Sequence, residues 1–329
     1  MTAARRSHGA AVDDVYTSAL HGYSAQMSAA EAAALAGQPG VSYVQPDARV
    51  ELTAQPTPTG VNRANADRSP TAGINRRDRR VNVDVAVVDT GVDLNHPDLN
   101  VFRPGARNCS SATTPDDGNG HGTHVAGTIG ALDNRRGVVG VAPGARIWPV
   151  RVLTADGSGT MADVICGIDY VTRNARRIEV ANLSLGGPGP ADDGNCGRSI
   201  GDALHQSICA SVRAGVTYAV AAGNSSADAA FTVPASYDEV ITVSAMADFN
   251  GRPGGGARAT CRPDADDTFA DFSNFGEDVD LVAPGVCIRS TLARGRYATM
   301  SGTSMAAPHV AGGAALFAAK HRAATPARV

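Results

Sequence analysis

Three polar residues, each close to glycine, could together carry out nucleophilic catalysis. Asp89 ends an apolar run, His121 stands in Gly-His-Gly-Thr-His, and Ser304 stands in Gly-Thr-Ser-Met-Ala-Ala-Pro-His. A serine hydroxyl is a weak nucleophile at neutral pH and needs an imidazole to take its proton. The imidazole needs a carboxylate to fix its tautomer and to stabilise it once it is charged. The residue types predict acyl transfer, with Ser304 as nucleophile, His121 as general base and Asp89 as the residue that orients His121.

Each of these residues is predicted to lie at the end of a regular element. Asp89 closes a strand whose near-continuous apolar pattern is typical of a strand buried on both faces. His121 opens a helix of small residues, and Ser304 opens a second helix after Gly302. The start of a helix carries free backbone N–H groups and a partial positive charge. A developing oxyanion beside Ser304 would be stabilised there.

From Val81 onward, predicted strands alternate with predicted helices. The strands are expected at Val83–Asp89, Arg146–Leu153, Val180–Leu185, Thr217–Ala221 and Val240–Val243. The helices are expected at His121–Ala131, Ala162–Asn174, Ile200–Ala214 and Ser304–Lys320. Alternation of this kind predicts an α/β fold, a doubly wound and mostly parallel sheet with helices on both faces. Such sheets bind their ligands at the carboxyl ends of the strands, where Asp89 stands.

The histidines and aspartates close to Asp89, His121 and Ser304 in sequence are expected to have structural rather than catalytic roles. His121 and His124 are three residues apart and could share a metal ion. No glutamate lies between them and no acidic or cysteine ligand follows in register, so we interpret His124 as a packed structural residue. Asp93 and Asp98 are the nearby alternatives to Asp89, but they lie in a turn-rich stretch and not at the end of a predicted strand. His309, in the first turns of its helix, is expected to pack rather than react.

The order Asp–His–Ser and the three flanking segments resemble the subtilisin-type serine endopeptidases, the subtilase family. The resemblance implies cleavage of protein substrates through an acyl-enzyme intermediate. It also implies that the side-chain amide of Asn224 and the N–H of Ser304 bind the oxyanion. Asparagine is also common in turns such as Gly-Asn-Ser for conformational reasons alone. The alternative is a catalytically silent relative that binds peptides or serves as a scaffold, which the presence of all four residues disfavours.

The resemblance extends to segments that would hold the substrate. In the family, two segments pair with an extended substrate backbone as flanking strands, an interaction by main-chain hydrogen bonds. They correspond here to Gly157, Ser158 and Gly159, and to Leu183, Ser184, Leu185 and Gly186. The second segment and Ala221, Ala222 and Gly223 would line the pocket for the residue before the scissile bond. Small uncharged residues there predict a roomy apolar pocket.

A structural calcium ion is compatible with the sequence, and no cofactor is expected for the chemistry. Asp280 resembles a calcium-binding carboxylate of the proteinase K-like branch, where the carbonyls of Asp238 and Val240 would complete the site. Calcium takes about six to eight oxygen ligands, so one carboxylate is a weak signal. A plain surface aspartate is an equal alternative.

The N-terminal part of the chain has the pattern of a small unit of its own. Strand-like patches surround His21-Gly22, Ser28 and Glu31 form a capping pattern for a helix, and Val41–Asp47 is predicted to be a strand. The pattern resembles the C-terminal half of a subtilase propeptide, which assists folding and inhibits the enzyme. Its first strand and helix are not expected in this chain, so we expect it to assist folding poorly.

Three domains are therefore expected. They are a partial propeptide over residues 1–52, a Pro- and Thr-rich linker and maturation region over 53–64, and a catalytic domain over 65–329. Residues 248–268 are interpreted as a surface loop inserted into that domain. The chain ends at Val329 where a helix would begin, so the catalytic domain is expected to be short or truncated.

Composition excludes several classes of protein. Hydrophobic residues make up 43% and charged residues 19%, a balance typical of a folded globular protein. No stretch reaches the roughly 18 apolar residues of a membrane span. The basic run Arg76–Arg80 has no interleaved aromatic residue, so no nucleic-acid partner is expected. We expect a monomer whose partners are protein or peptide substrates and its own propeptide.

The number and spacing of the cysteines indicate in which cellular compartment the protein is found. No signal peptide is visible at the start of the chain, yet six dispersed cysteines without a CxxC pair favour disulfides and an extracellular protein. Cys196 with Cys209 and Cys261 with Cys287 are the preferred local pairs. The alternative is a set of buried free thiols.

Overall fold

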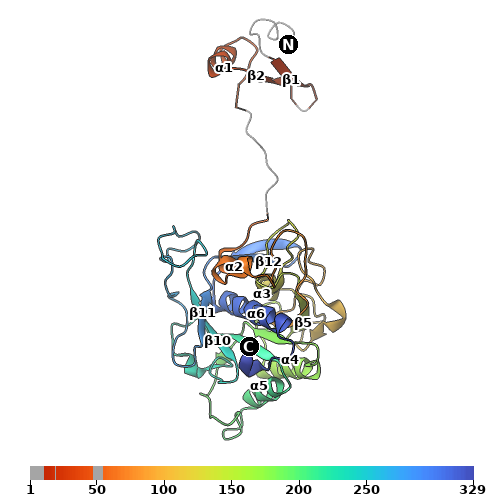
Figure 1. Cartoon of the computed structure of the whole chain (residues 1–329), viewed down its shortest axis with the longest axis vertical. Coiled ribbons are helices and arrows are strands. Elements are labelled where there is room, and N and C mark those ends of the chain that lie inside the picture. Colours follow the sequence, from red (N-terminus) through yellow and green to blue (C-terminus); the bar gives the residue numbers. More distant parts are fainter. Residues whose placement is uncertain (1–10, 19, 47–54) are drawn as a thin grey trace. The chain divides into compact units, whose positions relative to one another are not determined.

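The computed structural model describes residues 11–18, 20–46 and 55–329. The chain forms two compact units, Met1–Thr53 and Ala54–Val329 (Figure 1). None of the helices described is both long enough and apolar enough to cross a membrane.

The first unit contains an antiparallel hairpin of β1 (Ala11–Tyr16) and β2 (Gly22–Gln26), followed by α1 (Ala29–Ala36). The predicted capping box is confirmed, because Ser28 Oγ accepts a hydrogen bond from the N–H of Glu31 and the Glu31 carboxylate accepts one from the N–H of Ser28. The strand predicted at Val41–Asp47 is wrong. Residues 41–46 are coil and Asp47 lies outside the described residues. An apolar run becomes a strand only where a partner strand satisfies its backbone groups, and no described strand pairs with this one.

The second unit is built on a sheet of seven parallel strands, which confirms the predicted α/β fold. From one edge to the other they are β11 (Leu281–Pro284), β10 (Ile241–Met246), β8 (Thr217–Ala221), β6 (Val180–Leu183), β3 (Asp84–Asp89), β5 (Arg146–Arg151) and β4 (Arg107–Asn108). All six residues of β3 are buried, because the strand pairs with β5 on one side and with β6 on the other. The two short outer strands, β4 and β11, were not predicted.

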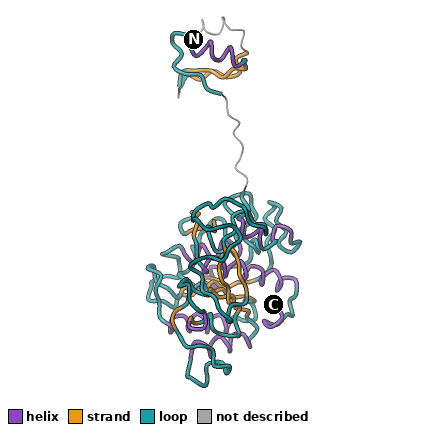
Figure 2. The backbone as a smooth tube through the Cα atoms, turned by 90° about the vertical axis from the view of Figure 1, so that its left-hand side faces the viewer, coloured by secondary structure: helices purple, strands orange, loops and turns teal. Residues whose placement is uncertain are grey.

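Helices cover both faces of this sheet (Figures 1 and 2). They are α3 (His121–Gly130), α4 (Met161–Arg173), α5 (Ala203–Arg213) and α6 (Thr303–Lys320), all within a few residues of the predicted bounds. The alternation of side chains along β3 divides the core. Val85 and Val87 pack in one cluster with residues of α3 and α6, whereas Ala86 and Val88 pack in another with α4 and α5.

Smaller elements complete the unit. β12 (Ile288–Leu292) and β13 (Arg296–Met300) form an antiparallel hairpin, and β7 (Gly187–Pro188) pairs with β9 (Thr232–Val233). Single turns of 3-10 helix lie at Ala66–Arg68, Arg103–Gly105, Ala229–Phe231 and Pro326–Arg328.

Part of the predicted linker over residues 53–64 is in fact folded. It contains α2 (Thr59–Arg63), and Val61 is buried against Val141. The side chain of Gln55 is buried and donates hydrogen bonds to the carbonyls of Leu132 and Val138. The Pro- and Thr-rich composition predicted a linker because the partners of these anchoring side chains lie far along the chain.

The segment 248–268 contains no helix or strand, as a surface loop should. Arg63 of α2 forms ion pairs with Asp248 and Asp267 at its two ends. Asp266, also near its end, is buried and accepts hydrogen bonds from the backbone of Phe249 and Ala257. The loop is therefore tied to the body of the unit at its base.

All six cysteines form disulfides. The predicted pairs Cys196–Cys209 and Cys261–Cys287 are confirmed, and Cys109–Cys166 is the third. The last pair joins residues 57 apart, so no local spacing indicated it.

Candidate active site

The site lies where the order of strands in the sheet reverses. β3 is flanked by β5 and β6, so the chain leaves β3 towards one edge and later returns towards the other. In doubly wound sheets, ligands bind in the crevice at the carboxyl ends of the strands at such a point. Asp89 is the last residue of β3 and has no exposed surface.

His121 faces Asp89 from the first residue of α3. The Nδ1 atom of His121 lies 2.8 Å from Asp89 Oδ1, which also accepts a hydrogen bond from the N–H of Thr90. A carboxylate at Nδ1 places the proton on that nitrogen and leaves Nε2 able to accept one. A glycine follows His121 because space is short: a Cβ on Gly122 would lie 2.1 Å from the carbonyl oxygen of Gly91.

Opposing influences act on the pKa of His121. Burial is the largest and lowers the pKa, whereas the charge and hydrogen bond of Asp89 and the charge of Asp117 raise it. The raising influences together prevail, so the pKa lies above the ordinary value of 6.5.

Ser304 stands in the first turn of α6, in contact with Ser184, the residue that follows β6. Its hydroxyl donates to the carbonyl of Ser184 at 3.2 Å, and the Ser184 hydroxyl donates to the carbonyl of Ser304 at 2.8 Å. In the described part of the chain, no hydrogen bond joins Ser304 Oγ to His121. Catalytic hydrogen bonds are often long before substrate binds, so this geometry is compatible with a catalytic pair.

Asn224 is held against the start of α6. Its Oδ1 atom accepts hydrogen bonds from the N–H of Thr303 at 2.8 Å and from Thr303 Oγ1 at 3.0 Å. These contacts fix the amide so that Nδ2 is left without an acceptor among the described residues. The N–H of Ser304 is in the first turn of α6, where N–H groups have no partner within the helix. Two donors are thus available near Ser304.

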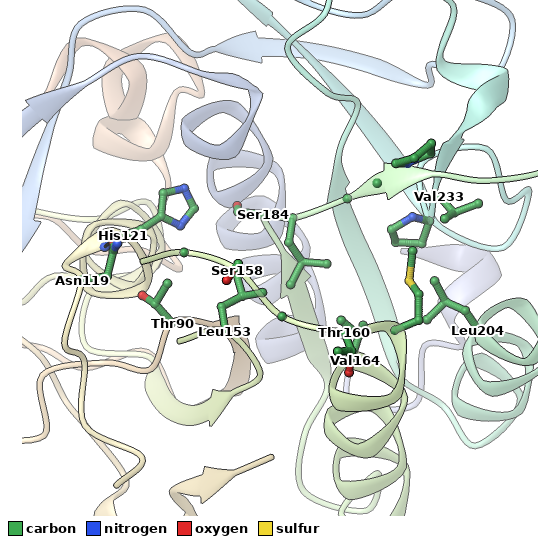
Figure 3. A pocket seen from close by; sticks show the side chains of 18 residues that line it. Thr90, Asn119, His121, Leu153, Ser158, Thr160, Val164, Ser184, Leu204 and Val233 are labelled. Carbon is green, nitrogen blue, oxygen red and sulfur yellow. Dashed lines mark hydrogen bonds between the residues drawn. The ribbon is translucent and has the colours of Figure 1, made fainter. Parts of the chain in front are cut away.

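A cavity of about 610 Å³ begins at His121 and runs between two chain segments (Figure 3). One wall contains Gly157, Ser158 and Gly159, and the other contains Ser184, Leu185 and Gly186. The far part is apolar, with the side chains of Met161, Val164, Leu204 and Val233. Its shape suits an extended chain with a large apolar side chain at the far end.

Four residues expected at this cavity do not line it, among them Ala221, the buried last residue of β8. Leu183 is fully buried inside β6, Ala222 is fully buried at the end of β8, and Gly223 contacts Asn274 and Thr303. The side chain of Leu183 packs instead in the core cluster that contains Ala86 and Val88.

The other two histidines near the triad residues are structural, as predicted. His124 Nε2 lies 3.1 Å from the carbonyl of Ile288, and His309 Nδ1 lies 2.9 Å from that of Met305. Burial lowers the pKa of each to about 4, so both rings are neutral at pH 7. Asp93 and Asp98, the alternative carboxylates, are hydrogen-bonded elsewhere, to Gly295 and Tyr297 respectively.

Comparison with known proteins agrees with this geometry. The sequence profile of the subtilase family matches residues 81–329. The chain belongs to the subtilase family. A second profile, peptidase inhibitor I9, matches residues 2–53, so an inhibitor-type propeptide precedes the subtilase domain.

Individual subtilases resemble the chain over most of its length. An alkaline protease of Alkalihalobacillus alcalophilus is 39% identical over 298 residues, which cover 91% of this chain and 69% of the relative. Subtilisin E of Bacillus subtilis (strain 168) is 41% identical over 295 residues, which cover 88% of this chain and 68% of the relative. The crystal structure of a cold-adapted subtilisin-like serine proteinase superposes with a TM-score of 0.61 at 36% identity, covering 77% of this chain and 82% of the other. As a subtilase, the protein is a serine endopeptidase with protein substrates, and its chemistry needs no cofactor.

A roomy apolar pocket was predicted, but the residues that line the apolar end of the subtilase cavity were not. Its residues come from α4, α5 and β9 and share no motif. One local signal was present: Thr160 and Asp163 form a capping box, which fixes where α4 begins and so which of its residues reach the cavity.

Proposed function

We propose that Ser304, His121 and Asp89 form the catalytic triad of this endopeptidase. The observation that carries the assignment is the 2.8 Å contact between His121 Nδ1 and Oδ1 of the buried Asp89 at the strand switch point. This contact orients His121 so that Nε2 is directed away from the carboxylate.

The chemistry follows in two steps. Ser304 Oγ attacks the peptide carbonyl carbon and passes its proton to His121 Nε2. When the tetrahedral intermediate collapses, the C–N bond breaks and His121 returns that proton to the leaving amine. Water then attacks the acyl-enzyme in the same way and releases the acid. Asp89 stabilises the imidazolium that exists between these proton transfers.

The oxyanion of each intermediate would be bound by Asn224 Nδ2 and the N–H of Ser304. Support comes from Thr303, whose two hydrogen bonds to Asn224 Oδ1 direct the amide nitrogen the other way. The donors are fixed before substrate binds, which is the condition for strong electrostatic stabilisation.

The substrate would lie extended between residues 157–159 and 184–186, with Leu183, Ala222 and Gly223 as supports behind this surface. Its backbone would pair with both segments, and an apolar side chain would fill the space at Met161 and Leu204. We expect a preference for apolar side chains at that position, because His121 is the single ionisable residue among the described residues that line the cavity.

A structural calcium ion would be held by the carboxylate of Asp280 and the carbonyls of Asp238 and Val240. Asp280 Oδ2 accepts a hydrogen bond from Thr242 N, whereas Oδ1 has no donor in the described part of the chain. Burial and the charges of Asp192, Glu239 and Asp280 raise the pKa of Asp238. This excess of negative charge would be relieved by a cation. Calcium should raise Tm, and Asp280→Asn should remove that rise.

The first unit would act as the chain's own inhibitor, and the mature enzyme would be an extracellular monomer without nucleic-acid or membrane partners. Three disulfides support an oxidising compartment. The proposed division is a propeptide over 1–52, a maturation region within 53–64 and a catalytic domain over 65–329. Residues 55–64 of the maturation region are folded onto the catalytic domain.

Labelling with a fluorophosphonate tests the nucleophile. Ser304→Ala should abolish labelling and peptide hydrolysis and leave the circular dichroism spectrum unchanged. Ser158→Ala, a serine in the wall of the same cavity, should keep both. Stoichiometric labelling of a serine other than Ser304 would contradict the assignment, and an unlabelled parent chain would support the silent relative.

A further inference from the structure

A second group of side chains of the metal-ligand type lies outside the cavity of the active site. Asp192 comes from the loop before α5, His205 from the first turn of α5 and Glu239 from the turn before β10. One potential ligand atom of each lies within 4.8 Å of the other two. His205 Nε2 is 2.7 Å from Glu239 Oε2 and 3.5 Å from Asp192 Oδ2.

His205 is buried and held in one orientation. Only 1% of its side chain is exposed, and the ring stacks on Tyr237 with centroids 4.0 Å apart and planes inclined by 1°. Tyr237 is itself fixed, because its hydroxyl donates to Asp202 Oδ2 at 2.7 Å. Among the described residues, His205 Nδ1 has no hydrogen-bond partner, and it lies 3.9 Å from Asp193 Oδ1.

The carboxylates around this ring outnumber the cations. Asp192, Asp193 and Glu239 each have an oxygen within 3.9 Å of a ring nitrogen of His205, and within the described residues none of them forms an ion pair with Lys or Arg. Even a protonated imidazole would offset only one of the three charges. Backbone N–H groups of the loop stabilise the two aspartates, including Gly194 N on Asp192 and Gly197 N on Asp193.

Of the three carboxylates, Glu239 has the fewest hydrogen-bond donors around it in the described part of the chain. Its Oε1 atom lies 3.3 Å from Cys196 Sγ, but that sulfur is bonded to Cys209 and carries no proton. In the described structure, the His205 ring is therefore the single proton donor to Glu239. A partly buried carboxylate with so little compensation is costly, whereas a metal ligand needs no further partner.

We propose that Asp192, His205 and Glu239 bind a divalent transition-metal ion, for which zinc is the best fit. One imidazole nitrogen and two carboxylate oxygens form a donor set that zinc accepts, with water as a fourth ligand. Calcium prefers oxygen donors only, so this site differs from the one proposed at Asp280.

The spacing of the donor atoms fits such an ion. Zinc–ligand bonds of about 2.0–2.2 Å in tetrahedral geometry place donor atoms roughly 3.3–3.6 Å apart. The 3.5 Å between Asp192 Oδ2 and His205 Nε2 already meets this condition. The 2.7 Å contact to Glu239 must widen, which its 28% exposed side chain permits. Asp193 near Nδ1 supplies the outer carboxylate that metal-binding histidines commonly have.

The ion would join the loop before α5 to α5 itself and to the turn before β10. It would stabilise the folded state by mass action, because the three ligands are brought together only by folding. It takes no part in peptide hydrolysis.

Zinc binding to the full chain tests the proposal. We would use untagged Ser304→Ala protein, to avoid self-digestion, dialyse it against a chelator and titrate it with zinc by calorimetry. One zinc ion per chain should bind and Tm should rise. Glu239→Gln and Asp192→Asn should each weaken binding at least tenfold. Glu239→Gln should keep the Tm of the metal-free parent, whereas Asp192→Asn should lower it, because one of the N–H groups of Gly194 and Asp238 loses its acceptor.

Two further variants locate the ion. Asp280→Asn should keep zinc binding, and His121→Ala in the same background should also keep it, because neither residue is a ligand. Absence of saturable binding by the parent would overturn the proposal. The proposal would also be overturned if Glu239→Gln and Asp192→Asn bound zinc as tightly as the parent. A loss of zinc binding in Asp280→Asn or His121→Ala would overturn it too. If Glu239→Gln fails to fold, Asp192→Asn alone decides the outcome.

Discussion

Asp117 joins the segment after Asp89 to the start of α3, which carries His121, the proposed base. Its Oδ1 atom accepts hydrogen bonds from Thr90 Oγ1 at 2.9 Å and from the N–H groups of Asn119 and Gly120. Its Oδ2 atom accepts from the N–H and the hydroxyl of Thr123. Thr90 follows Asp89, and residues 119–123 surround the start of α3. Asp117 is therefore a positioning residue for His121, and its charge also raises the pKa of that ring.

Replacing Asp117 should change the pH dependence of activity. His121 must be neutral to act as a base, so kcat/KM should rise with pH through the pKa of His121, which lies above 6.5. Asp117→Asn removes a charge that raises this pKa, so the rise should move to lower pH. The amide cannot accept at both of its positions, and one unsatisfied donor should cost about 1–3 kcal/mol of unfolding free energy.

Asp116→Asn is the matched control for this experiment. It removes the same charge one residue away, but Asp116 accepts from the N–H of Leu94 rather than from the start of α3. Its pH profile should match that of the parent. An unshifted profile in Asp117→Asn would reduce Asp117 to a structural residue.

Asn224 should contribute to kcat rather than to substrate binding. Asn224→Leu should lower kcat by roughly 10²–10³-fold, the loss known from a subtilisin that lacks its oxyanion asparagine, so this magnitude is adopted from a relative. Thr303→Val should cost less, because it removes one of the two hydrogen bonds that hold the amide. Steady-state kinetics with a peptide substrate measure both. A raised KM with unchanged kcat would place Asn224 in ground-state binding.

Glycines on one helix, α6, show how packing can reverse an intrinsic preference. A Cβ on Gly312 would lie 2.6 Å from Val141 Cβ, whereas a Cβ on the exposed Gly313 would meet no atom within 4 Å. Gly312→Ala should therefore lower the unfolding free energy by about 1–3 kcal/mol through overpacking. Gly313→Ala should raise it by about 0.5–1 kcal/mol, because alanine is the better helix former.

Denaturant unfolding of inactive Ser304→Ala protein measures this pair of variants. The two substitutions are chemically identical and adjacent in sequence, so the difference isolates the contact with Val141. Equal stabilities would show that the segment around Val141 moves aside at no cost.

For the whole molecule, the folded state limits where the propeptide can be removed. Gln55, Gly60 and Val61 are buried in the second unit and anchor residues 55–64, so we expect the peptide bonds of this segment to be poor sites for cleavage. We expect cleavage after Val50 and before Gln55, at the boundary between the two units. N-terminal sequencing of the mature protein checks the position.

The same experiment shows which enzyme makes the cut. Ser304→Ala should leave the junction intact if the chain processes itself, and Ser158→Ala should mature normally. Cleavage of purified Ser304→Ala protein would identify another protease. A mature chain that begins after Ala64 would mean that α2 is released rather than retained.

Much of this protein was predictable because its signals are local. The helix starts at His121 and beside Ser304, the strand end at Asp89 and the capping box at Ser28 each depend on a few adjacent residues, and all lie within one residue of the predicted position. The two confirmed disulfides that were predicted join cysteines only 13 and 26 residues apart. Short apolar runs were reliable only where a neighbouring strand pairs with them, which is why Val41–Asp47 failed.

The remaining features depend on contacts between distant segments, which no local pattern encodes. The apolar end of the cavity combines α4, α5 and β9, and Cys109–Cys166 spans 57 residues. Asp192, His205 and Glu239 come from three elements, and only their packing places the carboxylates around one buried ring. Sequence patterns identify which residues can do chemistry. Long-range packing decides which of them meet, at what distance and in how much water, and these quantities set their pKa values and ligands.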